Sequence, residues 1–130
     1  MDRAALLRTI PMFYGLAPDD LVALGQSLAA RDYKTGELIF NLGDAGDAMY
    51  IVADGHVNIH LPGENSRRVS LKDIAVGEYF GELALFDDKP RSASALATTE
   101  ALLLELSRET LSGYLERRPR AAMAILRTMA

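Results

Sequence analysis

The chain has 130 residues, of which 49% are hydrophobic and 25% charged, and a formal net charge of −4 at pH 7, which suits one domain with its own apolar core. Cysteine is absent, so disulfides, thiolate metal sites and thiol nucleophiles are excluded, and the negative charge disfavours direct contact with nucleic acid. No apolar run approaches the roughly 20 residues of a membrane helix and the N-terminus lacks a signal-peptide pattern, so we expect a domain of the cytoplasm that contacts no membrane.

Residues 1–30 are expected to form N-terminal helices. Three apolar residues at helical spacing, Leu6, Leu7 and Ile10, precede a proline that interrupts them. A second helix is expected to begin at Pro18, because a first helical turn tolerates proline and the two aspartates that follow favour the positive end of a helix.

The sequence pattern of residues 31–107 predicts short antiparallel strands. Seven of the ten glycines fall between Gly36 and Gly81 and divide this region into short pieces. The pieces ELIF, AMYIV, VNIHL and RRVSLKDI are rich in β-branched and aromatic residues, and SASALAT and ALLLELS add two further strands. Together with the glycine-bearing turns, these pieces suggest roughly eight strands, so the expected fold class is α+β, with an eight-stranded antiparallel jelly-roll flanked by N-terminal and C-terminal helices.

A helical period returns at residues 108–130. Ser107 is predicted to cap the first helix, and Pro119 to begin a second one. The apolar face of the second helix is expected to contain Ala122, Ile125, Leu126 and Met129. Because so short a helix is marginal unless this face packs on something, we expect the C-terminal helical region to be truncated.

The stretch FGELALFDDKPRSA, residues 80–93, has the features of an anion site. Gly81 opens a predicted short helix, whose first N–H groups would be unpaired and accessible to a ligand. Arg91 can meet two phosphate oxygens at once with its planar guanidinium, and Ser92 adds a hydroxyl beside it. Glu82 would repel a phosphate but could accept hydrogen bonds from sugar hydroxyls next to one. These residues alone fit either a nucleotide whose phosphate is folded back onto its sugar or a structural Glu82–Arg91 ion pair.

This stretch resembles the phosphate-binding cassette of cyclic-nucleotide-binding domains, which occur in kinase regulatory subunits, nucleotide-gated channels and catabolite-activator transcription factors. The cassette pattern is met by Phe80, Gly81, Glu82, Leu83, Ala84, Leu85, Pro90, Arg91, Ser92 and Ala93. A second family signature is met by Gly36, Gly43, Asp44, Gly46, Asp47, Tyr50, Ile51, Val52, Gly55 and Val57. The segment LLRTIPMFYGLAPDDL is similar to the family's N-terminal helices. The resemblance therefore covers residues 1–130 as one domain.

The resemblance implies a role for each cassette residue. Arg91 would meet the equatorial and axial oxygens of a cyclic phosphate, and Glu82 would accept from the ribose 2′-hydroxyl. Backbone N–H groups would come from Gly81, Leu83, Ala84 and Ser92, with the Ser92 hydroxyl as a further donor. The surface under the base would consist of Ile59, Val69 and Leu71, for which plain core packing is the alternative.

The resemblance also implies a function that is regulatory and not enzymatic. The ligand would be cAMP, the commoner ligand of such sequences, or else cGMP, with no cofactor. Binding is expected to move a C-terminal helix over the base and to signal to an output module of a longer parent: a transcription factor, channel, kinase or other enzyme. One alternative is an interaction module of the same fold without a ligand. Another is a transcription factor, which would need a helix-turn-helix after the roll.

Two other groups are set aside. His56 and His60 are placed on a surface strand, because a cupin-type metal centre would need a third histidine and a glutamate, so we expect no metal. Asp87, Asp88 and Lys89 are expected to form a solvated loop tip.

Overall fold

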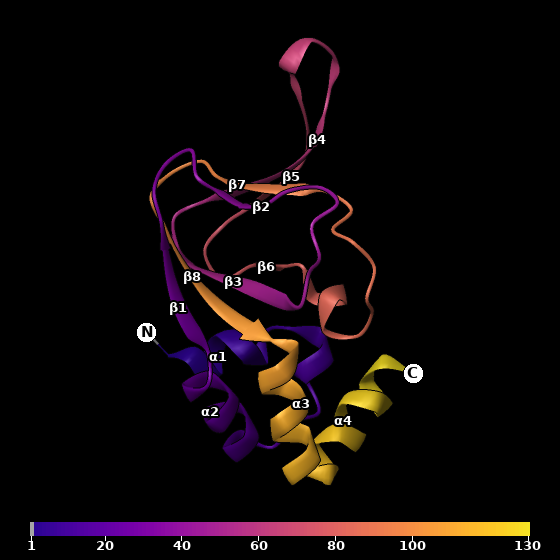
Figure 1. Cartoon of the computed structure of the whole chain (residues 1–130). Coiled ribbons are helices and arrows are strands. Elements are labelled where there is room, and N and C mark those ends of the chain that lie inside the picture. Colours follow the sequence, from indigo (N-terminus) through magenta and orange to yellow (C-terminus); the bar gives the residue numbers. More distant parts are fainter. Residues whose placement is uncertain (1) are drawn as a thin grey trace.

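The computed structural model describes residues 2–130 and shows a β-roll with helices packed at one end (Figure 1). Its two antiparallel sheets each have four strands, in the orders β1-β8-β3-β6 and β2-β7-β4-β5. The strands are β1 (Ala29–Tyr33), β2 (Leu38–Phe40), β3 (Ala48–Asp54), β4 (Val57–Pro62), β5 (Arg68–Ile74), β6 (Tyr79–Phe80), β7 (Ser94–Ala97) and β8 (Ala101–Ser107). The predicted eight-stranded roll is confirmed.

The α-helices begin where the sequence provides a proline or a capping side chain. They are α1 (Arg3–Arg8), α2 (Pro18–Gln26), α3 (Arg108–Arg117) and α4 (Pro119–Met129), with the 3-10 helices η1 (Pro11–Phe13), η2 (Glu64–Ser66) and η3 (Glu82–Leu85). Ser107 caps α3 as predicted, since its Oγ accepts from the Thr110 N–H at 3.1 Å. Across residues 2–130, no helix has the length and apolar character needed to cross a membrane.

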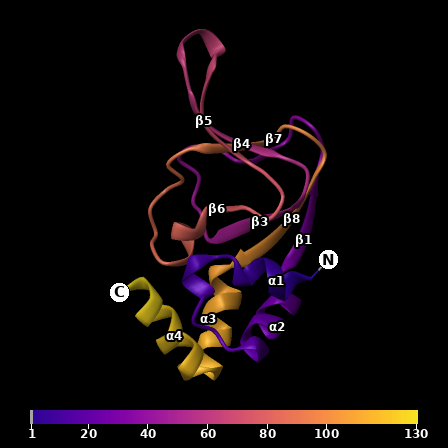
Figure 2. The same ribbon diagram turned by 180° about the vertical axis from the view of Figure 1, so that it is seen from behind.

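Two apolar clusters hold the fold together. One fills the roll between the two sheets, and the other lies between the sheet β1-β8-β3-β6 and the helices, which pack beneath it in both views (Figures 1 and 2). Strand β8 serves both clusters, since Leu103 points into the roll whereas Leu104 and Leu106 point toward the helices. Burial on both faces explains why this strand is a nearly continuous apolar run in the sequence.

The β4–β5 hairpin projects from the roll, away from the helices (Figures 1 and 2). Val69 and Leu71 of β5 are therefore 50% and 54% exposed, and the core packing considered for them is wrong. A register shift between Ile59 and His60 interrupts the pairing of β4 with β5. His60 lies opposite Ser94 of β7 and is buried, so its predicted surface position is also wrong.

Helix α4 packs on the N-terminal segment through a face that differs from the predicted one. Ala121 and Ile125, four residues apart, are buried in the cluster beneath the roll. Leu126 is 61% exposed, because each residue along a helix turns by about 100° and Leu126 therefore leaves the face of Ile125. Met129 lies on the face of Ile125 but is the last residue of α4, and it is 51% exposed. The predicted shared face is thus split between the core and the surface.

A buried carboxylate joins α2 to the junction between α3 and α4. Asp20 is 5% exposed, and its Oδ1 accepts a hydrogen bond from the Tyr114 hydroxyl and lies 3.2 Å from Nη2 of Arg118. Burial, with the hydrogen bond to Asp20, raises the pKa of Tyr114 to about 12, so the phenol remains a proton donor at neutral pH. Arg118 is the residue between the two helices, with φ −132° and ψ 73°.

Tyr114→Phe should lower the free energy of unfolding by about 1–3 kcal/mol, because Asp20 then keeps a buried oxygen with one partner fewer. Urea unfolding followed by circular dichroism measures the change. Tyr14→Phe is the matched control, since that ring is exposed and its loss of a hydroxyl should have little effect. An unfolding midpoint equal to that of the unmodified protein would show that this hydrogen bond does not stabilise the helix junction.

Candidate functional site

Gly81 makes the turn from β6 into η3 and has two reasons to be glycine. Its φ is +77°, in the left-handed region that other residues seldom adopt. A Cβ at this position would also lie 2.8 Å from Nη1 of Arg91. The predicted helix after it is a 3-10 helix of four residues, and no side chain of the described residues caps its start.

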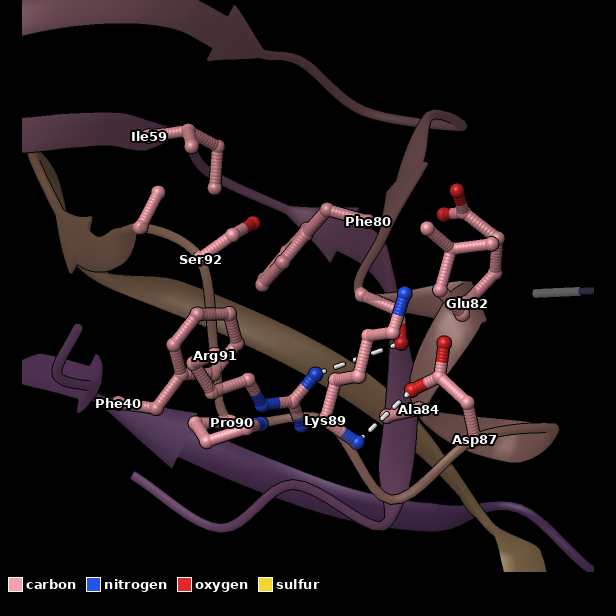
Figure 3. Close-up of a pocket in the computed structure, with 13 residues that line it drawn as sticks. Phe40, Ile59, Phe80, Glu82, Ala84, Asp87, Lys89, Pro90, Arg91 and Ser92 are labelled. Carbon is pink, nitrogen blue, oxygen red and sulfur yellow. Dashed lines mark hydrogen bonds between the residues drawn. The ribbon is translucent and has the colours of Figure 1, made fainter. Parts of the chain in front are cut away.

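The Arg91 side chain lies on the loop that returns from η3 and is held without a carboxylate (Figure 3). Its Nη2 donates to the Ala48 carbonyl at 2.8 Å and its Nη1 to the Gly81 carbonyl at 3.3 Å. The guanidinium carbon lies 4.1 Å from the centre of the Phe40 ring, a cation–π contact. Nε is buried and has no hydrogen-bond partner among residues 2–130.

These contacts leave the guanidinium short of negative charge. Burial lowers the pKa of Arg91, because desolvation disfavours the charged form, while Tyr50, Asp47, Asp44 and Glu105 act in the opposite direction. The ion pairs within the described part of the chain involve neither Arg91 nor Glu82. The alternative of a structural Glu82–Arg91 ion pair is therefore not realised in this structure.

A cavity of about 290 Å³ lies over the cassette and brings most of the predicted site together. Seven of the nine predicted residues line it, namely Ile59, Gly81, Glu82, Leu83, Ala84, Arg91 and Ser92. Val69 and Leu71 do not, since they lie on the projecting hairpin. A neighbouring hollow of about 510 Å³ shares Ile59 and Glu82 with this cavity and adds Lys72 of β5.

Asp87 and Lys89 also line the cavity, so their assignment to a solvated loop tip was incomplete. Their position in the sequence, between η3 and Arg91, could have predicted that they line the cavity. Phe40 and Phe80 complete the wall, with ring centres 5.9 Å apart, and Tyr50 stacks on Phe80 at 5.3 Å. This aromatic cluster supports Arg91 from the side of the roll.

Arg108, the first residue of α3, is a second important arginine, and sequence analysis missed it. Its Nη2 donates to the carbonyls of Asp87 at 2.6 Å and Ala84 at 2.7 Å, and Nε donates to Ala84 at 3.0 Å. Its Nη1 pairs with the Asp88 carboxylate at 2.6 Å, and Nη2 also reaches the Gly46 carbonyl at 3.3 Å. One guanidinium thus attaches η3 and the following loop to the start of α3.

Comparisons with known proteins agree with this geometry. The family model described as "Cyclic nucleotide-binding domain" matches residues 30–118. The Cyclic AMP receptor protein of Thermus thermophilus is 40% identical over 115 residues, which are 86% of this chain and 52% of that protein. The CRP-like cAMP-activated global transcriptional regulator of Mycobacterium tuberculosis is 31% identical over 125 residues, 96% of this chain and 56% of that protein.

A solved structure shares nearly the whole fold. The N-terminal domain of a transcriptional regulator from Streptomyces coelicolor A3(2) superposes with a TM-score of 0.89 at 35% identity, covering 95% of this chain and 89% of that one. The chain spans about half the length of the curated relatives that it matches.

Proposed function

Because the chain belongs to the cyclic nucleotide-binding domain family, we propose that it is a regulatory domain that binds cAMP in the cavity over residues 80–93. The observation that carries the proposal is the Arg91 guanidinium, which lines this cavity and has no carboxylate partner among the described residues. A cyclic phosphate carries one negative charge and would supply the missing counter-ion.

The other cassette residues suit a ribose that carries this phosphate. Glu82 lines the cavity as an acceptor, and a carboxylate beside a phosphate site can accept from the ribose 2′-hydroxyl. Ser92 contributes a hydroxyl, and Gly81 and Leu83 border the cavity where their backbone N–H groups could face the phosphate. Ala84 borders the cavity too, but its N–H donates to the Gly81 carbonyl at 3.2 Å and would have to be shared with the ligand. Ile59 and Phe80 offer apolar surface to the purine.

We favour cAMP over cGMP, because two relatives at 31% and 40% identity are named for cAMP. The proposed role is regulatory and not enzymatic, as in those relatives. Binding would draw η3 inward and allow α4 to move over the base with its exposed Leu126 and Met129. The output module would lie in a longer parent, since the match covers only 52–56% of the length of these relatives.

Calorimetric titration with cAMP, cGMP and linear 5′-AMP tests the proposal. We expect one site per chain, tighter binding of cAMP than of cGMP, and at least about tenfold weaker binding of 5′-AMP. Ring closure holds the phosphate of cAMP against its ribose, whereas the linear phosphate of 5′-AMP must lose rotational freedom before it can meet Arg91 while the ribose meets Glu82. Tighter binding of cGMP would overturn the base preference. Absence of binding by either cyclic nucleotide would favour the second candidate, an interaction module of the same fold that takes no ligand.

A further inference from the structure

Lys89 is a second cation in the cavity wall. It stands two residues before Arg91 on the loop that follows η3, and both residues line the cavity of about 290 Å³. In Figure 3 its side chain extends away from its own loop, toward the space between Arg91 and Glu82. This direction differs from that of a lysine on a solvated loop tip, which would point away from the cavity.

Hydrogen bonds hold the backbone at Lys89 and at Arg91, so the position from which the Lys89 side chain extends is restrained. The Lys89 N–H donates to Oδ1 of Asp87 at 3.1 Å. Beyond Pro90, the Arg91 N–H donates to the Asp44 carbonyl at 2.8 Å and the Arg91 carbonyl accepts from Gly43 at 2.8 Å. A lysine on a fixed backbone loses less conformational freedom when its ammonium contacts a ligand.

The ammonium has no ion pair within residues 2–130, although carboxylates are near it in sequence. Asp88 is paired with Arg108 at 2.6 Å. Asp87 uses Oδ1 to accept the backbone N–H of Lys89 itself. The Lys89 ammonium therefore has no carboxylate partner among the described residues and could pair with a ligand.

Lys89 changes the net charge of the cavity wall. Glu82 and Asp87 are negative, and Lys89 and Arg91 are positive, so the wall is neutral with Lys89 and carries one net negative charge without it. A wall with a net negative charge would repel an anionic ligand. Arg91 also directs Nη1 and Nη2 to carbonyl groups, at 3.3 and 2.8 Å, which limits the donors that it can offer.

We propose that Lys89 is a second phosphate-binding residue, whose ammonium donates to an exocyclic oxygen of the bound cyclic phosphate. The proposal rests on the proposed function, since it needs a cyclic nucleotide in the cavity. Arg91 then holds one side of the phosphate with its planar group, and Lys89 reaches the other side as a compact charge with three N–H donors.

The test compares Lys89→Met and Lys89→Arg with Lys34→Met, an exposed lysine that does not line the cavity. Calorimetry with cAMP at low and high salt gives the affinity, and displacement of a fluorescent cAMP analogue in a stopped-flow instrument gives the dissociation rate. At low salt Lys89→Met should bind cAMP about three- to fivefold more weakly, with faster dissociation, and this difference should shrink at high salt. Lys89→Arg and Lys34→Met should stay close to the unmodified protein.

Two results would overturn the proposal while cAMP binding itself stands. One is an unchanged affinity of Lys89→Met at low salt. The other is a loss confined to the association rate, since this would mean that Lys89 attracts the ligand from a distance and does not contact it. If the unmodified protein binds no cyclic nucleotide, the proposed function fails first and this inference fails with it.

Discussion

Arg91→Leu should weaken cAMP binding by about a hundredfold or more. Removing one partner of a desolvated charge pair costs roughly 3–5 kcal/mol, and each 1.4 kcal/mol is a factor of about ten in affinity. The leucine would fill part of the space but would leave the cyclic phosphate against Glu82 and Asp87, which also line the cavity. Isothermal titration calorimetry at the highest practical protein concentration measures the loss.

Two further variants show what this experiment measures. Arg91→Lys keeps the charge but loses the planar guanidinium and its contact with Phe40. Its affinity for cAMP should therefore lie between those of the unmodified protein and Arg91→Leu. Arg68→Leu on the projecting hairpin removes an exposed arginine and should leave the affinity unchanged. The Arg91 variants also free the carbonyls of Ala48 and Gly81, so urea unfolding must confirm that each is folded. Binding by folded Arg91→Leu at the unmodified affinity would remove Arg91 from the site.

Local sequence patterns were sufficient where the structure depends on neighbours along the chain. β3 and β8 are buried on both faces, so they are apolar runs that can be recognised in the sequence alone. Ser107 and Pro119 mark the starts of α3 and α4 by their own capping chemistry. Gly81 and Arg91 lie ten residues apart in one loop region, so their meeting over the cavity could be predicted from the motif.

The errors at α4, at β5 and at Arg108 depend on how distant segments of the chain meet in the fold. The buried face of α4 is decided by its packing against η1, more than a hundred residues earlier, and an apolar period alone could not separate Ile125 from Leu126. Val69 and Leu71 alternate as core residues would, but β5 is an edge strand of a hairpin that leaves the roll. Arg108 follows a capping serine and belongs to no cassette motif, so only the folded chain shows what it contacts.

Arg108→Met should both destabilise the domain and weaken cAMP binding. Its side chain gives hydrogen bonds to the carbonyls of Ala84 and Asp87 and an ion pair to Asp88, and methionine can replace none of them. Hydrogen bonds from a charged group contribute about 1.5–3 kcal/mol each, and part of this is recovered by water, so we expect a loss of about 2–4 kcal/mol in the free energy of unfolding. Urea unfolding without ligand measures it.

The loss of affinity has a separate cause. Without Arg108 the cassette can leave its position against α3, so only a fraction of molecules would be ready to bind, and the apparent dissociation constant rises by the inverse of that fraction. We expect the affinity of Arg108→Met for cAMP, measured by calorimetry, to be roughly tenfold weaker than that of the unmodified protein. The affinity of Arg108→Lys should lie between these two, because a lysine keeps the charge but reaches fewer acceptors. Hydrogen exchange should show that cAMP protects α3 in the unmodified protein and much less in Arg108→Met. If Arg108→Met is less stable but binds cAMP with unchanged affinity and protects α3 equally, Arg108 stabilises the fold without linking the ligand to the helix.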